Sequence, residues 1–401
     1  MTLPVETMPD AVPRPMVSKL PRVGTTIFTV MSALAAEHNA VNLGQGFPDF
    51  ECDPKLIDSV HRAMRAGHNQ YPPMTGVVNL RQNVSAKICA LYGRKYDPES
   101  EITITAGATQ AIMTAVLALV RPGDEVIVLE PAYDSYIPSI QLAGGHPIFV
   151  RMTPPKKGGQ FTVPWDQVRD AITERTRLIM INSPHNPTGA VFTQVDLSVL
   201  EDIVAHTGIY VVSDEVYEHM VFDDMRHESA ARYPGLSEHC VVISSFGKTY
   251  HVTGWKIGYV AAPARLTTEF RKVHQFNVFT VNTPMQYALS DYMEDPAPYL
   301  MLPKFYQAKR DFFLDGLAKT RLQATPSAGT YFQLVRYDML KDRCGELSEA
   351  DFCQWLTRNA GVAAIPVSAF YDTPVESGVV RLCFAKTEAT LERALDRLGR
   401  L

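Results

Sequence analysis

Short apolar runs, separated by stretches long enough for helices, fill the chain between about residues 100 and 262. Runs that are apolar throughout and rich in β-branched residues predict strands buried on both faces. Because several intervening stretches, such as residues 194–206, have helical length, the pattern predicts an α/β fold with a mostly parallel central sheet covered by helices. The predicted strands span residues 102–105, 126–129, 148–150, 178–181, 209–212, 241–244 and 257–261, and an apolar helix spans 108–120.

The pattern changes after about residue 295. Residues 305–317 and 387–398 carry their apolar positions on one helical face, whereas residues 379–385 alternate as a strand. Ser348 and Asp351 have the spacing of a capping box, which marks the start of another helix. This mixture predicts a smaller α+β domain at the carboxyl end of the chain.

The first 40 residues are rich in proline, then helix-like over residues 26–36, and they contain no obvious core of their own. A chain of 401 residues allows two or three domains. We expect a large domain over residues 45–295. We expect a small domain built from residues 1–44, which include an N-terminal arm, together with residues 296–401.

The composition is that of an ordinary globular protein, with 46% apolar and 20% charged residues, which excludes disordered, collagen-like and coiled-coil chains. The net charge is −5, without a block of basic residues, which argues against nucleic acid or a membrane surface as a partner. The six cysteines form no CxxC pair, the N-terminus does not resemble a signal peptide, and no apolar stretch reaches the roughly 18 residues of a membrane span. We therefore expect a cytoplasmic protein.

Candidate catalytic groups follow several of the predicted strands. Lys248 lies among glycine and small hydroxyl residues after the strand at 241–244. In surroundings of low polarity a lysine can lose its proton and act as an amine nucleophile. Asp214 follows the strand at 209–212, at the edge where parallel sheets bind ligands. Taken singly, a lysine such as Lys248 is far more often a solvated surface residue, and Asp214 could as well be a helix cap.

Three further elements suggest sites for anions and for an amide. Gly107 lies at the turn into the helix at 108–120, whose N-terminus favours a phosphate. Asn186 is presented by a loop with two prolines, and Arg381 is flanked by apolar residues, so that it needs an anionic partner. Alone, each could be structural, as an ordinary turn or a buried salt bridge.

Together, these groups meet the needs of pyridoxal phosphate acting on an amino acid. The cofactor aldehyde needs a lysine, its ring nitrogen needs an acid, and its phosphate needs a helix N-terminus and a cation. The amino-acid substrate in turn needs a cation for its carboxylate, which Arg381 can supply.

The motifs resemble those of fold-type I, class I aminotransferases that depend on pyridoxal phosphate, in the branch of the methionine and kynurenine aminotransferases. The resemblance runs from NLGQGFPD at residues 42–49 to RLCFAK at 381–386. Its most specific motif is SSFGKTYHVTGWKIGY at 244–259, and INSPHNPTG at 181–189 and SDEVYEH at 213–219 add to it.

The resemblance implies a role for each site residue. Lys248 forms the Schiff base with the cofactor and moves the proton between the substrate α-carbon and cofactor C4′, and Asp214 pairs with the ring nitrogen. Tyr217 and Asn186 bind the ring's 3′ oxygen, and Tyr133 stacks on the ring. The cofactor phosphate is bound by Ala108, Thr109, Ser245 and Lys256. Tyr71 reaches the phosphate in the neighbouring subunit. The substrate carboxylate is bound by Arg381, Asn186 and Gly46.

The resemblance also implies a homodimer with shared active sites, and amino-acid and 2-oxo-acid substrates in a ping-pong reaction. It favours methionine and aromatic amino acids as donors. Phe276, Phe279 and Tyr331 suit an apolar side-chain pocket, although each could simply belong to the core. Cysteine-conjugate β-elimination is the alternative within the same cofactor chemistry.

Other protein classes fit less well. Residues 44–49 begin like a dinucleotide-binding turn, but Asp49 stands where the last glycine belongs. Residues 214–227 contain acids and histidines without the spacing of metal ligands, so we expect no metal. The roughly 40 residues before the first motif are too few and too rich in proline for the DNA-binding domain of a regulator that borrows this fold.

Overall fold

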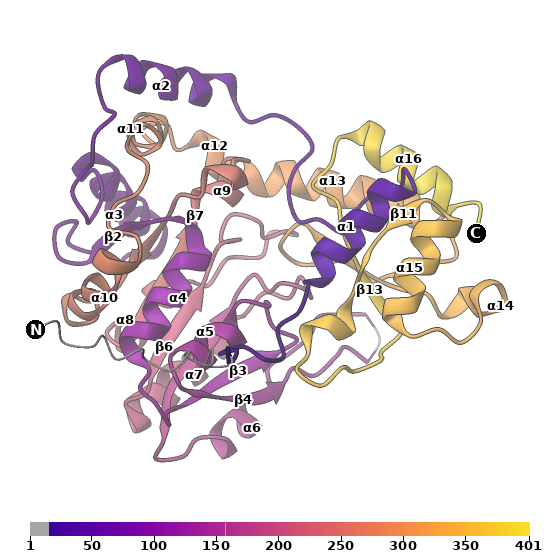
Figure 1. Cartoon of the computed structure of the whole chain (residues 1–401), viewed down its shortest axis with the longest axis horizontal. Coiled ribbons are helices and arrows are strands. Elements are labelled where there is room, and N and C mark those ends of the chain that lie inside the picture. Colours follow the sequence, from indigo (N-terminus) through magenta and orange to yellow (C-terminus); the bar gives the residue numbers. More distant parts are fainter. Residues whose placement is uncertain (1–15, 157) are drawn as a thin grey trace, which may run out of the picture.

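The computed structural model describes residues 16–156 and 158–401, and its largest element is a seven-stranded sheet (Figure 1). The strand order is β2-β8-β7-β6-β5-β3-β4, and all neighbours run parallel except β8, which is antiparallel to β2 and β7. The prediction of a mostly parallel central sheet is therefore confirmed. The strands are β2 (Ile102–Thr105), β3 (Glu125–Glu130), β4 (His146–Arg151), β5 (Thr176–Asn182), β6 (Tyr210–Asp214), β7 (Cys240–Ser245) and β8 (Gly258–Ala261).

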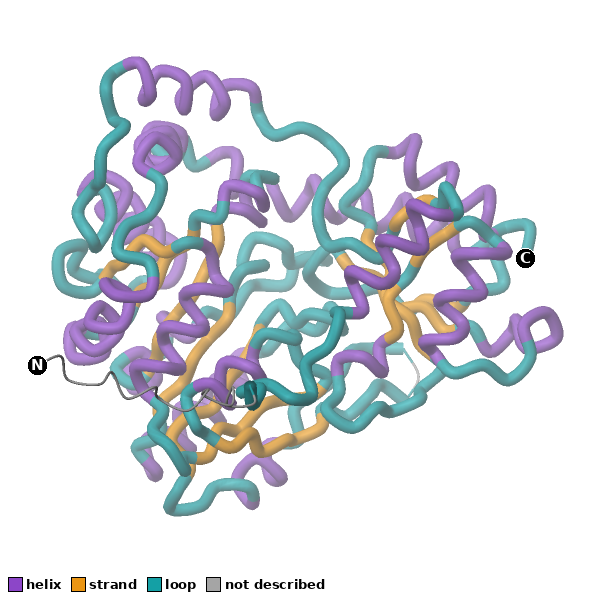
Figure 2. Tube along the Cα trace, in the orientation of Figure 1, coloured by secondary structure: helices purple, strands orange, loops and turns teal. Residues whose placement is uncertain are grey.

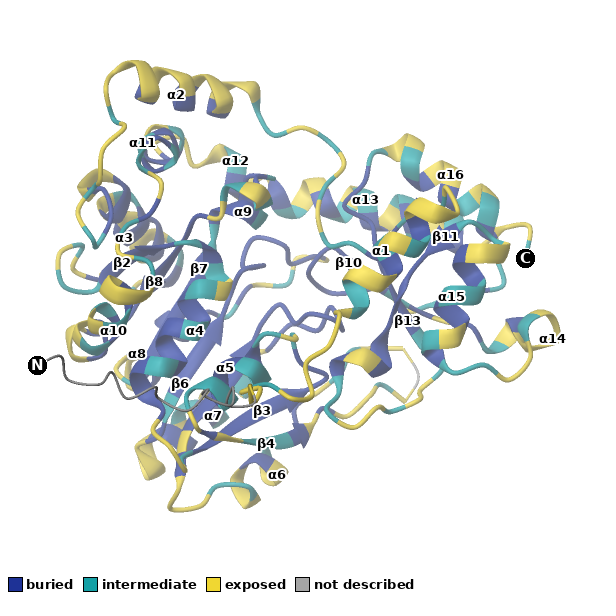
Figure 3. Ribbon diagram, in the orientation of Figure 1, coloured by how far each residue is buried: buried dark blue, intermediate teal, exposed yellow. Residues whose placement is uncertain are grey.

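Helices cover both faces of this sheet, so alternate residues of one strand belong to different cores (Figure 3). Val126 and Val128 of β3 pack with α4 (Gly107–Leu119) and α10 (Ala264–Asn277), whereas Ile127 packs into the opposite core with α3 (Val78–Tyr92) and α7 (Gln194–Thr207). Continuous apolar strands are therefore required, because both of their faces are buried.

A smaller antiparallel sheet of four strands, in the order β12-β13-β10-β9, lies in the C-terminal part of the chain. Its core also contains Met31 of α1 (Ile27–Glu37) and Val41 of β1 (Val41–Asn42), and β1 pairs in parallel with β11 (Val362–Ala363). Figure 1 shows α1 beside α15, although these two helices are far apart in the sequence. The other strands of this region are β9 (Gln323–Ala324), β10 (Phe332–Arg336), β12 (Ile365–Pro366) and β13 (Val379–Cys383).

The predicted domain boundaries stay a prediction, which these separate cores support. Residues 1–15 of the predicted N-terminal arm lie outside the described residues. The remaining helices are α2 (Pro54–Arg65), α5 (Tyr136–Leu142), α6 (Trp165–Asp170), α8 (Pro234–Ser237), α9 (Phe246–Thr249), α11 (Thr283–Tyr292), α12 (Ala297–Leu300), α13 (Leu302–Leu317), α14 (Lys341–Cys344), α15 (Glu349–Asn359) and α16 (Glu388–Leu398), and the 3-10 turns are η1 (Ala230–Arg232), η2 (Thr253–Trp255), η3 (Asp338–Leu340) and η4 (Val367–Phe370).

Loops rather than helices or strands fill the region between the two sheets (Figure 2). The loops that follow β5 and β6, and the short helix α9 after β7, all leave the same edge of the large sheet because these strands are parallel. Across the described ranges, no helix combines the length and apolar character that a membrane crossing requires.

Candidate active site

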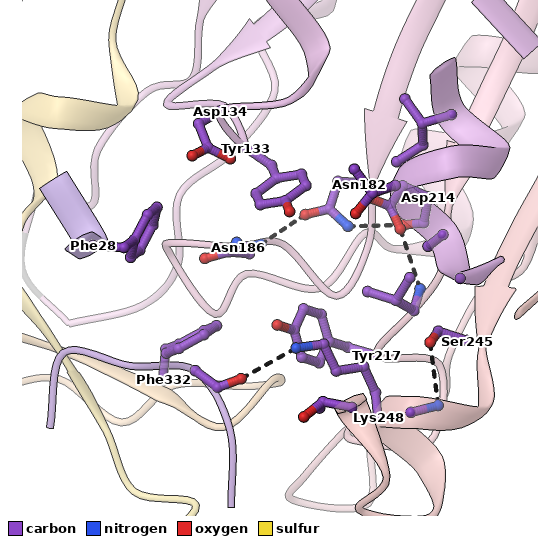
Figure 4. A pocket seen from close by; sticks show the side chains of 18 of the residues that line it. Phe28, Tyr133, Asp134, Asn182, Asn186, Asp214, Tyr217, Ser245, Lys248 and Phe332 are labelled. Atoms are coloured by element: carbon purple, nitrogen blue, oxygen red, sulfur yellow. Dashed lines mark hydrogen bonds between the residues drawn. The ribbon is translucent and has the colours of Figure 1, made fainter. Parts of the chain in front are cut away.

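A cavity of about 350 Å³ lies where the strand ends of the large sheet meet the small sheet (Figure 4). Of the residues that the resemblance assigns to the cofactor or to the substrate carboxylate, Tyr71 alone does not line it. The lining includes Gly46, Ala108, Thr109, Tyr133, Asn186, Asp214, Tyr217, Ser245, Lys248, Lys256 and Arg381.

Lys248 enters the cavity from α9, directly after β7, and its side chain is half-buried. Its Nζ donates to the hydroxyl oxygen of Tyr331 at 2.7 Å and to the carbonyl oxygen of Gly46 at 3.2 Å. Burial, together with the nearby cations Arg381 and Lys256, lowers the pKa of Lys248 to about 8. The chain can therefore present a neutral amine near neutral pH.

Asp214 is buried at the end of β6. Its Oδ2 accepts a hydrogen bond from the hydroxyl group of Tyr136 at 2.6 Å, and its Oδ1 accepts one from the backbone N–H of Val216 at 3.3 Å. Burial nevertheless raises the pKa of Asp214 to about 6, since within the described ranges no ion pair compensates it. A cationic ring nitrogen in the cavity would supply the opposite charge that this carboxylate needs.

The N-terminus of α4 forms a cradle for an anion. Its N-cap residue, Ala106, provides no side-chain hydrogen bond to the helix, so the first backbone N–H groups of α4 are open to a ligand in the cavity. Gly107 has φ +77°, and a Cβ atom there would lie 3.4 Å from Nζ of Lys256. Ser245 adds a hydroxyl group from the end of β7. These groups fit a phosphate.

Arg381 projects from β13 and is 1% exposed. It donates to Oδ1 of Asn186 at 2.7 Å and to the carbonyl oxygen of Gly44 at 3.0 Å, while its guanidinium carbon lies 3.8 Å from the centroid of the Phe332 ring. Among the described residues, no carboxylate pairs with Arg381 and its Nε has no hydrogen-bond partner. Burial lowers the pKa of Arg381 to about 10. A carboxylate from a ligand would satisfy this buried cation.

Two tyrosines and a glycine shape the walls of the cavity. Tyr217 is 4% exposed, and its ring centroid lies 5.5 Å from Nζ of Lys248. Tyr133 packs edge-on against Tyr136, with ring centroids 5.8 Å apart. At Gly46 a Cβ atom would lie only 2.7 Å from the Phe332 ring, so only glycine fits this close approach.

The predicted aromatic pocket residues do not line the cavity of their own chain. Phe276 and Phe279 are 87% and 48% exposed, and Phe279 packs edge-on against Tyr71, which is 80% exposed. Tyr331 is fully buried and contacts Lys248 instead.

Sequence reasoning missed several contributors to the site. Asn182 belongs to the motif at residues 181–189, but only the fold shows that its Nδ2 donates to the Asp214 carbonyl oxygen at 2.8 Å. The fold likewise shows that Tyr136, three residues after Tyr133, binds Asp214. Phe28 and Phe332 reach the cavity from α1 and β10. An aromatic residue in an apolar stretch carries no sequence signal that separates a site wall from an ordinary core.

The acids and histidines of residues 214–227 have other partners. Glu215 Oε2 lies 2.9 Å from Nε2 of His227, Glu218 binds Lys87 at 2.7 Å, and Asp223 binds Arg310. In the part of the chain that the structure describes, no group of three or more histidines, cysteines and acids is arranged to hold a metal ion.

Comparison with known proteins gives consistent matches over nearly the whole chain. The family model for aminotransferases of class I and II matches residues 38–398. Methionine aminotransferase of Escherichia coli (strain K12) is 49% identical over 96% of this chain and 98% of its own length. A probable N-succinyldiaminopimelate aminotransferase of Mycobacterium tuberculosis is 40% identical over 96% of this chain and 98% of its own length. Human kynurenine–oxoglutarate transaminase 1 is 34% identical over 91% of this chain and 93% of its own length.

The structural comparison agrees with these matches. A crystal structure from Escherichia coli, described as having a methionine aminotransferase function, superposes with a TM-score of 0.92 at 48% identity. The superposition covers 97% of this chain and 100% of that one.

Proposed function

The chain belongs to the class I and II aminotransferase family, whose class I members depend on pyridoxal phosphate, and from this premise we propose that it transfers the amino group of an apolar L-amino acid to a 2-oxo acid. Methionine or an aromatic amino acid is the proposed donor. One observation carries the proposal, namely that Arg381 is a buried cation without a carboxylate partner among the described residues, in the same cavity as Lys248 and Asp214.

The cofactor, when bound, supplies the aldehyde that takes up the amino group and the ring that accepts the electron pair left at the substrate α-carbon. We assign its phosphate to the N-terminus of α4 with Ser245 and Lys256, and its ring nitrogen to Asp214. Tyr133 would stack on the ring, and Tyr217 with Asn186 would bind the 3′ oxygen.

Lys248 is the proposed catalytic base. With a pKa of about 8, its amine is neutral in part of the molecules near neutral pH and can take the proton from the substrate α-carbon. Arg381 would bind the substrate carboxylate, assisted by Asn186 and the backbone of Gly46. The two half-reactions would use the same site in turn, so that the first oxo acid leaves before the second binds.

The walls of the cavity support an apolar substrate side chain. Phe28 and Phe332 flank Arg381, at 5.3 and 3.8 Å from its guanidinium carbon to their ring centroids. The cations that line the cavity in the described ranges are Lys248, Lys256 and Arg381, each with a proposed role. A second carboxylate on the substrate side chain would find no further cation there.

We also propose that two copies form a homodimer with shared active sites. The exposed aromatics Tyr71, Phe276 and Phe279 lie outside the cavity of their own chain, and a partner's cavity would give them a place. In this arrangement Tyr71 would reach the phosphate bound by the partner subunit.

A panel of amino donors crossed with oxo-acid acceptors tests the proposed substrate class. The purified protein is first checked for the visible absorbance of bound cofactor and then supplied with methionine, aromatic amino acids, glutamate and N-succinyldiaminopimelate. We expect the highest kcat/KM for methionine or an aromatic donor. A preference for glutamate or N-succinyldiaminopimelate as donor, both of which carry an additional carboxylate, would overturn the proposed substrate class.

A further inference from the structure

The amine of Lys248 is held by a hydroxyl group and a backbone carbonyl group, neither of which has a role toward this amine in the proposed function. Nζ donates to the hydroxyl oxygen of Tyr331 at 2.7 Å and to the carbonyl oxygen of Gly46 at 3.2 Å. The Tyr331 hydroxyl group itself donates to the Gly46 carbonyl oxygen. The three groups therefore form a closed triangle of hydrogen bonds.

The donors and acceptors of this triangle fix the direction of the lysine lone pair. A carbonyl oxygen only accepts, so the single hydroxyl proton of Tyr331 is used on Gly46 and its oxygen is left to accept from Lys248. A neutral amine has two N–H groups and one lone pair. Because both N–H groups point to Tyr331 and Gly46, the lone pair points away from them.

We propose that Tyr331 is a positioning residue, which holds the free amine of Lys248 so that its lone pair faces the substrate α-carbon. The proton taken from that carbon turns the amine into an ammonium group with three N–H donors. Two of them stay on Tyr331 and Gly46, and the third carries the transferred proton, so that it can be delivered again without rotation of the side chain.

Tyr331 is suited to this role because it cannot move easily. Its side chain is fully buried, and its ring packs edge-on against Tyr217 and Phe332 at centroid distances of 5.2 and 4.9 Å. Its hydroxyl group is therefore a fixed point, whereas the lysine has a long flexible side chain. A preorganised base loses less entropy when the proton is transferred.

The same backbone segment joins this triangle to the proposed carboxylate site. Arg381 donates to the carbonyl oxygen of Gly44, two residues before the carbonyl oxygen that accepts from Lys248 and Tyr331. The segment at residues 44–46 thus lies between the cation that would bind the substrate and the amine that would take its proton.

Tyr331→Phe tests the inference, because it keeps the buried ring and removes only the hydroxyl group. Tyr306→Phe is the matched control. The Tyr306 ring lies 5.7 Å from that of Tyr331 in the same aromatic cluster, and its buried hydroxyl group has no hydrogen-bond partner in the described part of the chain. The melting temperature of each variant is recorded first.

The first readout is the titration of Lys248 in the cofactor-free protein, by competitive acetylation with acetic anhydride and peptide mass spectrometry. An acceptor stabilises the ammonium form, so its loss should lower the pKa of Lys248 by about one unit in Tyr331→Phe and leave it unchanged in Tyr306→Phe. The other titratable groups that face this amine are Asp214, Tyr217, Lys256, Arg381 and Cys383, which both variants retain.

The second readout is single-turnover reaction of the holoenzyme with α-deuterated and ordinary methionine, and it rests on the proposed function. We expect Tyr331→Phe to slow the step about three- to tenfold and to raise its isotope effect, with unchanged substrate affinity. Absence of turnover in the wild-type protein would refute methionine as donor. A normal Lys248 titration in Tyr331→Phe would overturn the positioning role, whatever the donor is.

Discussion

Arg381 has surroundings that the carboxylate of a ligand would complete. It is a buried guanidinium group that binds an amide and a carbonyl oxygen, and within residues 16–156 and 158–401 it lacks an anionic partner. A buried cation without its anion lowers the stability of the free protein, and such strain is typical of sites shaped for binding.

Replacing Arg381 should affect substrate binding and the stability of the free protein in different ways. In Arg381→Met we expect kcat/KM for methionine to fall about 100- to 1000-fold, because truncation of one partner of a buried charge pair costs about 3–4 kcal/mol. The melting temperature of the cofactor-free protein should not fall, since the buried charge is removed with it. Steady-state kinetics and calorimetry measure the two effects, and a loss of kcat/KM smaller than tenfold would contradict the assignment.

We expect Asp214 to make cofactor binding depend on pH. Its carboxyl group has a pKa of about 6 in the structure, so it becomes protonated as the pH falls through 6 and can then no longer pair with a cationic ring nitrogen. We expect the affinity for pyridoxal phosphate to drop between pH 7.5 and pH 5 more steeply in the wild-type protein than in Asp214→Asn. Fluorescence titration at several pH values measures it, and parallel curves for the two proteins would argue against the pairing.

Sequence patterns predicted the residues of the site better than their contacts. Lys248, Asp214 and Arg381 stand out because each is a charged group beside an apolar strand. Tyr136, Phe332 and the hydroxyl contact of Tyr331 could not be predicted, because their partners come from distant parts of the chain. Phe276 and Phe279 suit an apolar pocket by their chemistry but lie outside the cavity of their own chain, since an apolar side chain alone does not indicate which surface it faces.

At the scale of elements, a buried network of hydrogen bonds connects the strand ends that carry the proposed catalytic groups. Glu218 accepts hydrogen bonds from Lys87 of α3 at 2.7 Å, from Tyr92 at 2.6 Å and from Ser244 of β7 at 2.6 Å. Tyr259 of β8 also donates to it, at 2.9 Å. These bonds, with the charge of Lys87, hold the pKa of Glu218 well below its usual range despite its burial.

Removing the cation of this network should destabilise the large sheet. We expect Lys87→Met to lower the free energy of unfolding by about 3–5 kcal/mol at pH 7.5, because the Glu218 carboxylate stays buried without its cation. Glu218 has a lowered pKa in the folded wild-type protein, so its contribution is full above the unfolded value near 4.3 and is lost only gradually as the pH falls from there toward the folded value. In Lys87→Met the buried carboxyl group has no cation beside it, so its pKa rises and it takes up a proton at pH 4. The variant then no longer buries an unpaired charge, and the difference between the two proteins should shrink near pH 4.

Denaturant unfolding at both pH values measures this effect. The double variant Lys87→Met with Glu218→Gln is the control, and it should recover part of the stability because no charge remains buried. An equal loss in the single variant at pH 7.5 and pH 4 would show that the pair contributes through packing rather than charge.

The elements themselves were largely predictable. The seven strands of the large sheet lie within about two residues of the apolar runs, because strands buried on both faces must be apolar throughout. The antiparallel direction of β8 was not predictable, since an apolar run does not encode strand direction. α13 begins at Leu302, before the predicted start at residue 305, because Pro303 is favoured in the first turn of a helix.

At the scale of the whole molecule, the proposed dimer predicts that two inactive variants can rescue each other. Lys248→Ala removes the proposed base from its own cavity, and Tyr71→Ala removes the group proposed to reach the partner's cavity. In a dimer of one Lys248→Ala chain and one Tyr71→Ala chain, the cavity of the Lys248→Ala chain lacks both groups. The cavity of the other chain keeps its own Lys248 and receives an unchanged Tyr71 from its partner. We expect purified mixed dimers, isolated with two different affinity tags, to regain up to about half of the wild-type activity, in line with one intact site of two.

The separate homodimers are the controls and should both be impaired. If the mixed dimers showed only the mean of the two homodimers, Tyr71 would act within its own chain or not at all. Size-exclusion chromatography with light scattering should give twice the chain mass of 44.6 kDa for every species.

The most direct test of the central claim, that Lys248 is the group that takes up the cofactor, is to identify the lysine on which the cofactor is fixed. Sodium borohydride links pyridoxal phosphate covalently to the lysine that binds it, and peptide mass spectrometry then locates the added mass. We predict a single modified position, Lys248, and no visible cofactor absorbance in Lys248→Ala. Modification of Lys256 or any other lysine in place of Lys248 would contradict this account of the site.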